Sequence, residues 1–129
     1  MLGAKGLGSS LKPKKKSLFN QIGEEKIIEK SFYGNLNDYT KLNSKISQVK
    51  PNIIFHLAAQ PLVLESYKNA LNTHNTNIMA KVNLLVTCRR INSIQNNVII
   101  TTEKVYKIKN KKNIISAKEK GERDDWYSD

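Results

Sequence analysis

The sequence predicts an α/β protein built on a parallel sheet, because short apolar runs alternate with amphipathic segments along the chain. The clearest apolar run covers residues 52–57, and it leads into the small-residue turn Leu57-Ala-Ala-Gln60. Isoleucine and phenylalanine favour a strand here, Pro51 limits its start, and Pro61 stops any continuation beyond the turn. A buried parallel strand that delivers a small-residue turn at its carboxyl end is a common way to build a cofactor crevice.

The remaining elements come in alternating order. Strands are expected at residues 5–11, 26–33, 52–57 and 98–102, and helices at 38–49, 64–70 and 72–91. Asp38 is the expected N-cap of the first helix, and Asn72 or Thr73 that of the last. The last helix is expected to carry an apolar stripe of Ile78, Val82, Leu85 and Val86. Right-handed crossovers would then give a parallel sheet that is covered on both faces.

Length and composition narrow the class of protein. With 129 residues, of which 39% are hydrophobic and 26% charged, the chain is expected to be a single soluble domain. No apolar stretch approaches the roughly 20 residues that span a bilayer, and the N-terminus lacks the apolar centre of a secretory signal. Cys88 is expected to be a small buried thiol in a reducing cytosol. These features predict a cytoplasmic protein, and no pattern calls for a metal or a membrane.

The net charge of +11 raises the question of nucleic-acid binding. Lysines gather between Lys12 and Lys16 and again between Lys104 and Lys112, and such runs can attract phosphate backbones. Aromatic residues, which could stack on bases, make up only 7% of the chain. The runs are therefore interpreted as solvated loops, and a non-catalytic basic binding module stays an alternative.

Three polar or small-residue segments come directly after successive predicted strands. They are Gly34-Asn35, the run from His56 to Pro61, and the run from Thr101 to Lys104. In an open parallel sheet, the carboxyl ends of the strands form the edge at which ligands bind. Ordinary strand-to-helix turns would give the same pattern, so position alone leaves both interpretations open.

Longer sequence motifs resemble the extended short-chain dehydrogenase/reductase superfamily, and within it the NAD-dependent epimerase/dehydratase family. The matching segments are Phe55 to Val63, Glu65 to Tyr67, Thr76 to Met79, Val82 to Leu85 and Thr101 to Tyr106. The phrase with His56 and Gln60, together with Ser17-Leu-Phe19, is most similar to the CDP-glucose 4,6-dehydratase branch. The resemblance implies a partial Rossmann-type doubly wound sheet that lacks the first strand and the C-terminal substrate domain. Residues 1–129 would form one incomplete NAD-binding domain with a basic tail from about residue 104.

The resemblance also implies a lyase in which tightly bound NAD is an internal redox catalyst. Such enzymes convert CDP-glucose to CDP-4-keto-6-deoxyglucose by oxidation, elimination of water and reduction. Tyr127 corresponds to the tyrosine that removes the sugar 4-hydroxyl proton, and Thr102 would hydrogen-bond the sugar. Glu103, which replaces the family's aspartate, and Lys104 would handle the proton transfers of elimination. A dTDP- or UDP-sugar epimerase or dehydratase is the alternative, although Lys104 stands where dTDP-sugar enzymes carry glutamate.

For the cofactor, the resemblance implies that small residues line the nicotinamide half of NAD and that the long helix supports them. The lining residues would be Leu57, Ala58, Ala59 and Gln60, supported by Thr76 and Asn77. Asn35 and Leu36 would lie near the adenine, with Asn35 in place of the family's aspartate. His56 is expected to be structural.

The glycine-rich turn of the family is expected to be absent. Gly3, Gly6 and Gly8 imitate its spacing, but no strand precedes them, so they are not expected to cradle a pyrophosphate. The sequence also ends two residues after Tyr127, before the lysine that activates the tyrosine in the family. Without a central first strand, the two halves of the sheet cannot pair. The chain alone is expected to be marginally stable, inactive and weak in NAD binding, with a homo-oligomer or a complementing fragment as possible partners.

Overall fold

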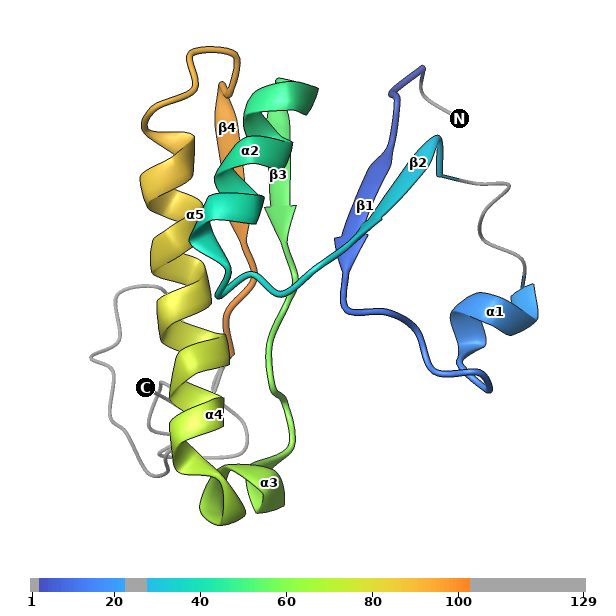
Figure 1. Ribbon diagram of the computed structural model, residues 1–129, viewed down its shortest axis with the longest axis vertical. Coiled ribbons are helices and arrows are strands. Elements are labelled where there is room, and N and C mark those ends of the chain that lie inside the picture. The colour runs from blue at the N-terminus through green and yellow to red at the C-terminus, as the bar shows by residue number, and fades with distance from the viewer. Residues whose placement is uncertain (1–2, 23–27, 103–129) are drawn as a thin grey trace, which may run out of the picture.

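The computed structural model of the protein describes residues 3–22 and 28–102. Within these ranges, four strands alternate with helices, and the strands form two separate two-stranded parallel sheets (Figure 1). The sheet therefore divides at the place where the absence of a central strand predicted a division. Glu103, Lys104 and Tyr127, together with the rest of the expected basic tail, lie outside the described residues.

The first sheet pairs β1 (Leu7–Ser10) with β2 (Lys30–Tyr33), and the short helix α1 (Leu18–Ile22) lies between them in sequence. Both strands were predicted, and both are shorter than expected. Gly6 and Gly8 serve this pairing, since the Gly6 carbonyl accepts a 2.9 Å hydrogen bond from the Glu29 N–H. A Cβ atom at Gly8 would come within 3.3 Å of the Ile28 side chain. Gly8 therefore belongs to a closely packed strand and Gly6 directly precedes it, so neither forms a phosphate-binding turn.

The second sheet pairs β3 (Ile53–His56) with β4 (Asn96–Ile99). Helices α2 (Tyr39–Val49) and α5 (Ala80–Cys88) lie against one face of this sheet (Figure 1). The buried core of the described residues is centred on Leu42, Leu84 and Cys88. Partly buried apolar residues surround this centre: Leu36, Ile46, Ile54 and Ile94. The predicted burial of the Cys88 thiol is confirmed, and burial raises its pKa, which keeps it protonated.

Helix α2 begins as the sequence predicts. The Asp38 side chain accepts a hydrogen bond from the Lys41 backbone N–H at 3.1 Å, and the Lys41 ammonium lies 2.7 Å from the other carboxylate oxygen. The carboxylate thus satisfies one of the free N–H groups of the first turn. The helix ends at Lys50, which adopts a left-handed conformation with φ of 50° and donates to the Ile46 carbonyl.

Replacement of Asp38 by alanine is expected to lower the melting temperature by a few degrees, whereas Asp38→Asn should retain most of the cap. The hydrogen bond from the Lys41 side chain lowers the pKa of Asp38. The stabilisation is therefore present above the pKa of the unfolded aspartate and is lost as pH falls through the lower folded pKa. Thermal melts of both variants at neutral and strongly acidic pH measure this. An alanine penalty of equal size at both pH values would contradict the assignment.

The long helical segment after β3 differs from the prediction at its start. It comes after α3 (Val63–Lys68) and comprises α4 (Ala70–His74), a π-helical turn (Asn75–Met79) and α5. The predicted N-cap at Asn72 or Thr73 is wrong, because the Asn69 side chain caps the helix by accepting from the Asn72 N–H at 3.3 Å. None of the helices in the described ranges is long and apolar enough to cross a bilayer.

The predicted apolar stripe of this helix is also wrong. The buried positions of α5 are Ala80, Leu84, Thr87 and Cys88, whereas Ile78, Val82 and Leu85 are exposed and Val86 is half-buried. Small side chains at buried positions allow α5 to pack closely on α2. Thr87 is fully buried, although its hydroxyl has no hydrogen-bond partner among the described residues. The apolar residues that were predicted to be buried therefore lie mostly on the side of the helix that the described residues leave uncovered.

The prediction of a sheet covered on both faces is not met by the described residues. Successive residues of a strand point to opposite faces, so Ile54 and His56 face the helices while Ile53 and Phe55 point the other way. Ile53 is 50% exposed and Phe55 is 63% exposed, and Val98 lies opposite Phe55 in the register. Within residues 3–22 and 28–102, nothing covers this face of the sheet, and several apolar side chains are exposed on it.

Candidate functional site

The carboxyl ends of β3 and β4 lie next to each other and end at the same edge of the sheet. The Ile100 N–H donates to the His56 carbonyl at 3.0 Å, one residue beyond the last paired position. Leu57 and Thr101 therefore begin two adjacent turns, as expected from the sequence. The side chains of Leu57, Ala58 and Ala59 are exposed there, so they are accessible to a ligand.

A single side chain clamps the turn after β3. The Gln60 N–H donates to Asn77 Oδ1 at 2.8 Å, and Asn77 Nδ2 donates back to the Gln60 carbonyl at 3.3 Å. Asn77 stands on the π-helical turn, a rare conformation that occurs frequently at functional sites. Because one amide satisfies both backbone groups of Gln60, the turn is fixed to the long helix. Two helix residues were predicted to support the cofactor. Asn77 holds the Gln60 turn, and Thr76 lies beside it in the same turn, half-buried.

The Gln60 side chain is directed into the protein. Its Oε1 accepts from the Leu62 N–H at 2.7 Å, and its Nε2 donates to the Leu62 carbonyl at 3.1 Å and to Thr73 Oγ1 at 3.0 Å. Thr73 is only 1% exposed and donates in turn to the Asn69 carbonyl at 3.1 Å. Gln60 therefore shapes the turn instead of presenting a free amide to a ligand. Sequence reasoning missed Thr73, although its position four residues before Asn77 places both on one helix face.

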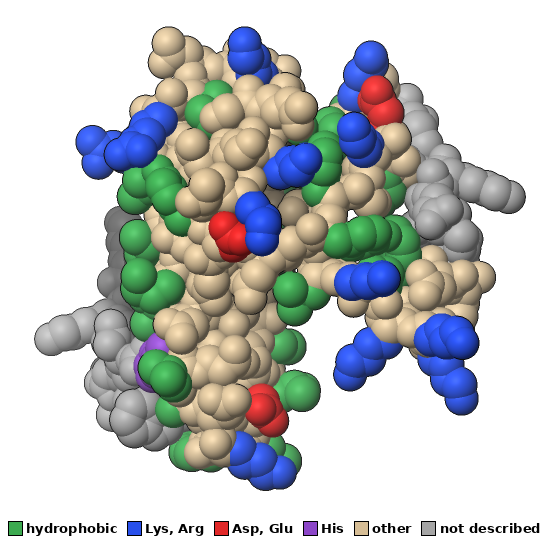
Figure 2. Space-filling view, viewed as in Figure 1, with side chains coloured by type: hydrophobic (Ala, Val, Ile, Leu, Met, Phe, Trp, Pro, Cys, Tyr) green, Lys and Arg blue, Asp and Glu red, His purple; other side chains and the backbone are tan. Residues whose placement is uncertain are grey.

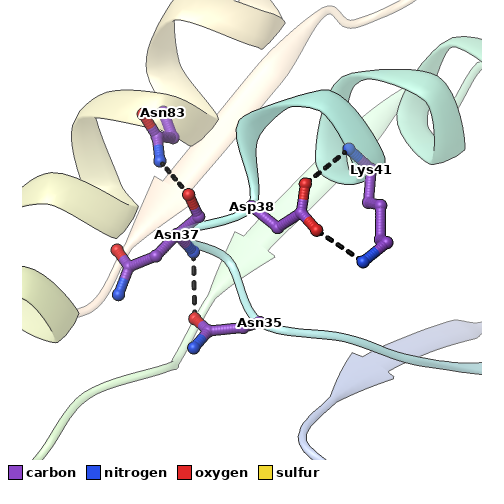
Figure 3. A network of polar contacts seen from close by, with 5 residues as sticks. All are labelled: Asn35, Asn37, Asp38, Lys41 and Asn83. Atoms are coloured by element: carbon purple, nitrogen blue, oxygen red, sulfur yellow. Dashed lines mark hydrogen bonds and ion pairs between the residues drawn. The ribbon is translucent and has the colours of Figure 1, made fainter.

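The turn between β2 and α2 is held in a similar way (Figure 3). Asn35 Oδ1 accepts from the Asn37 N–H at 3.0 Å, which is an Asx turn. Leu36 packs against the core, and Asn83 Nδ2 donates to the Leu36 carbonyl at 3.1 Å and to the Asn37 carbonyl at 3.4 Å. The expected adenine-contacting residue Asn35 thus uses its acceptor within its own turn. Asn83 was not among the predicted site residues, and it ties this turn to α5.

His56 is buried at the end of β3, and its expected structural role stays a prediction. Only 4% of its surface is exposed, and its Nε2 has no hydrogen-bond partner within the part of the chain that is described. Burial lowers the pKa of His56, and the positive charge of Lys81 lowers it further. The imidazole is therefore neutral near pH 7, which is the form that a buried site tolerates.

The stability of the chain is expected to fall as pH drops below about 6.5, the ordinary pKa of histidine. The unfolded His56 then binds a proton that the folded state resists, and the loss continues until pH reaches the lower folded pKa. Urea unfolding at about pH 7.5 and about pH 5.5 would show a lower midpoint in acid. His56→Leu should reduce this difference. Equal midpoints for the unsubstituted chain would refute the expectation.

A dinucleotide fits this edge in part. Exposed Ala58 and Ala59 leave space for a flat ring, and the Asn77 clamp gives that surface a fixed shape. A pyrophosphate normally needs free backbone N–H groups at a helix N-terminus or in a glycine-rich turn. The N-terminus of α2 is already occupied by the Asp38 carboxylate, which would repel a phosphate. The described residues therefore suit the ring end of a dinucleotide and contain no pyrophosphate cradle.

Other kinds of site find less support in the described ranges. No group of three or more His, Cys, Asp or Glu residues there could hold a metal ion. On the face shown in Figure 2, the lysine and arginine side chains form several separate groups over different parts of the molecule. This distribution agrees with solvated surface charges better than with one continuous phosphate-binding patch.

Comparisons with known proteins agree with this geometry. Residues 12–114 match the GDP-mannose 4,6 dehydratase family. Over 90 residues, the chain is 41% identical to the CDP-glucose 4,6-dehydratase of Salmonella typhimurium. That alignment covers 70% of this chain and 25% of the Salmonella protein, so the chain spans about a quarter of its relative.

Solved structures show the same fold at lower identity. The UDP-Glc/GlcNAc 4-epimerase of Campylobacter jejuni superposes with a TM-score of 0.78 at 18% identity, over 97% of this chain and 45% of that one. The UDP-glucose 4-epimerase of Stenotrophomonas maltophila, solved with bound NAD and formylated UDP-arabinopyranose, gives 0.76 at 14% identity with the same coverage. The predicted partial Rossmann-type fold is confirmed.

Proposed function

Because the chain belongs to the GDP-mannose 4,6 dehydratase family, we propose that it is part of a nucleotide-sugar 4,6-dehydratase that binds NAD at the carboxyl ends of β3 and β4. The observation that carries this proposal is the turn of small exposed residues Leu57–Ala59, which Asn77 clamps through Gln60 at the end of β3. The substrate proposed is CDP-glucose, since the 41% identical relative is a CDP-glucose 4,6-dehydratase.

Each described site residue has a separate task in this proposal. Ala58 and Ala59 leave space for the nicotinamide ring, and Leu57 packs against one side of the ring. Asn77 holds the turn in place through its hydrogen bonds to Gln60. NAD would supply a reversible hydride acceptor for the sugar. Thr102, half-buried at the start of the turn after β4, would orient the sugar by hydrogen bonding. An Asn35–Leu36 turn anchored by Asn83 would form the adenine end of the site.

Three further residues carry the proton transfers in the proposal. Tyr127 would remove the proton of the sugar 4-hydroxyl as C4 is oxidised. The 4-keto group then acidifies the C5 proton, which Glu103 would accept while Lys104 helps the C6 hydroxyl leave as water. The hydride would return to C6 and a proton to C5, so the sugar loses one water overall and its redox state is balanced. Together these steps produce a nucleotide-linked 4-keto-6-deoxy sugar.

Saturation-transfer difference NMR with NAD tests the binding site directly. We expect stronger saturation of the nicotinamide protons than of the adenine protons, because the ring lies on Ala58 and Ala59. Ala59→Leu should remove most of the nicotinamide signal by filling that space, while the exposed Ala4→Leu, a matched change far from the turn, should not. Stronger saturation of adenine, or equal effects of the two variants, would contradict the proposed placement.

A further inference from the structure

The segment between β1 and α1, residues 11–17, carries a dense group of positive charges and is called the lysine loop below. Its four lysines are all exposed: Lys12, Lys14, Lys15 and Lys16. Residues 3–22 contain no aspartate or glutamate, and none of the four lysines forms an ion pair with any residue that the structure describes. The charges of the loop are therefore available to an anion.

The backbone of the lysine loop is tied to α1. Asn20 Nδ2 donates to the Lys14 carbonyl at 3.1 Å and to the Lys15 carbonyl at 3.5 Å, and the Ser17 N–H donates to the Lys14 carbonyl at 2.9 Å. These carbonyls are thus bound within the loop, while the lysine side chains extend into solvent. In Figure 2, lysine side chains gather over the segment that Figure 1 shows between β1 and α1.

The lysine loop starts beside the turn that is proposed for the adenine end of the dinucleotide site. β1 and β2 are parallel, and the Gly34 N–H donates to the carbonyl of Ser10, the last residue of β1, at 2.9 Å. Asn35 follows that hydrogen bond on one strand, and Lys12 follows it by two residues on the other. Both segments therefore leave the sheet at the same carboxyl edge.

The carboxylates of the described ranges do not neutralise the lysine loop. Glu29 directly precedes β2 and so lies at the opposite edge of the sheet, and Glu65 stands on α3. Asp38 is the carboxylate of the turn after β2, but Lys41 engages both of its oxygens, through its N–H at 3.1 Å and its ammonium at 2.7 Å. The carboxyl edge of the first sheet is thus locally positive.

The path of the chain gives β1 a defined place in the Rossmann-type fold. The chain forms β1, then β2 at its side, and then crosses through α2 to β3 and β4. In Figure 1, β1 lies on the side of its sheet that faces β3. In the doubly wound order 3-2-1-4-5-6, this path fits places 2, 3, 4 and 5, so β1 takes place 2.

The turn after that strand selects between the two forms of a nicotinamide dinucleotide. An aspartate or glutamate there accepts a hydrogen bond from the ribose 2′-hydroxyl of NAD, whereas a cationic side chain accommodates the 2′-phosphate of NADP. This chain has lysines at that turn and no acid within residues 3–22. It therefore lacks the acceptor that favours NAD and has donors suited to a phosphate.

We propose that the lysine loop binds the 2′-phosphate of the adenosine ribose, so that the site takes NADP in preference to NAD. The inference rests on the proposed dinucleotide site and concerns only which dinucleotide that site prefers. Lys12 is nearest to the strand end and meets the phosphate, and Lys14 to Lys16 add to the local positive charge. A phosphate monoester carries about −1.5 to −2 charges at neutral pH. One local group of lysines suits one such phosphate.

Calorimetric titration of the full chain with NADP and with NAD tests the preference. At about 50 mM salt, NADP should bind at least about tenfold more tightly, since several exposed charge pairs add to the affinity. At about 0.5 M salt the ratio should fall to less than about threefold, because salt screens exposed charges. Equal affinities at low salt would overturn the inference and leave the NAD site intact. Absence of binding by both dinucleotides would overturn the site and the inference together.

Two matched variants separate a local phosphate site from the general positive charge of the chain. Lys12→Glu and Lys5→Glu make the same change in net charge, at opposite ends of β1, and both lysines are exposed. Lys12→Glu should weaken NADP binding about tenfold and leave NAD within about threefold. Lys5→Glu should keep the preference for NADP. Equal losses of NADP affinity in the two variants would show that net charge alone attracts NADP, and would overturn the inference.

Amide chemical shifts of the unsubstituted chain give a test that does not depend on any variant folding. The difference between the spectra with saturating NADP and with saturating NAD reports the position of the added phosphate. It should be centred on residues 11–17. A difference centred on any other part of the chain would contradict the assignment of the 2′-phosphate to the lysine loop.

Discussion

Replacement of Leu84 by alanine is expected to lower the free energy of unfolding by about 2–5 kcal/mol. Leu84 is 4% exposed and lies at the centre of the cluster with Leu42 and Cys88, so its truncation leaves a cavity where α5 packs on α2. Few other apolar side chains in the described residues are buried, and a domain of this size has only about 5–15 kcal/mol to lose. The variant should therefore show little or no cooperative unfolding transition in urea, monitored by circular dichroism.

The matched control is Leu71→Ala on α4. Leu71 is 75% exposed, so the same chemical change should alter the free energy of unfolding by no more than about 0.5 kcal/mol. Equal destabilisation by the two alanine variants would show that the core is not where the packing of α2 and α5 places it.

Replacement of Asn77 by alanine is expected to free the turn after β3. The change removes both hydrogen bonds to the Gln60 backbone and leaves two half-buried polar groups without that partner, at a cost of about 1–3 kcal/mol. NAD affinity should fall about tenfold, because the ring-binding surface of Ala58 and Ala59 loses its fixed shape. Amide hydrogen exchange of Gln60 measures the first effect, and titration with NAD measures the second.

The control for Asn77 lies five residues earlier on the same helical segment. Asn72 is exposed, and its replacement by alanine should leave both the Gln60 exchange rate and NAD affinity unchanged. If Asn77→Ala leaves Gln60 as protected as in the parent chain, then the clamp does not hold the turn.

The sequence predicted the strands and their order because each strand is a local apolar run bounded by turn residues. The division of the sheet was predicted from the family resemblance, which implied a doubly wound sheet without its central first strand. The start of the long helix was wrong because Asn69, Asn72 and Thr73 can all cap a helix, and only the folded backbone selects one.

The buried face of α5 was wrong for a different physical reason. Hydrophobicity identifies what a helix could bury, whereas close packing at Ala80 and Thr87 is decided by the shape of the neighbouring helix and sheet. Val82 and Leu85 are more apolar than the buried Ala80 and Thr87, and they remain exposed in the described fold.

The parts of the candidate site that directly follow a strand end could be predicted from the sequence. The parts that depend on contacts between residues distant in sequence could not. The turn Leu57–Gln60 and the helix residue Asn77 were expected from sequence motifs that resemble the family. Thr73 and Asn83 were not, because their partners are Gln60 and the Leu36 carbonyl, 13 and 47 residues away along the chain. A polar residue within a helix gives no signal of such a partner.

The most direct test of the proposed dinucleotide site is a titration of the isotopically labelled chain with NAD, monitored by amide chemical shifts. We expect saturable shifts at the ends of β3 and β4, in Leu57–Gln60, at Asn77 and at Thr101–Thr102. Shifts confined to the lysines between Lys12 and Lys16 would instead indicate a charge-driven surface contact. That result, or the absence of any saturable shift at the two strand ends, would contradict the placement of NAD at this edge of the sheet.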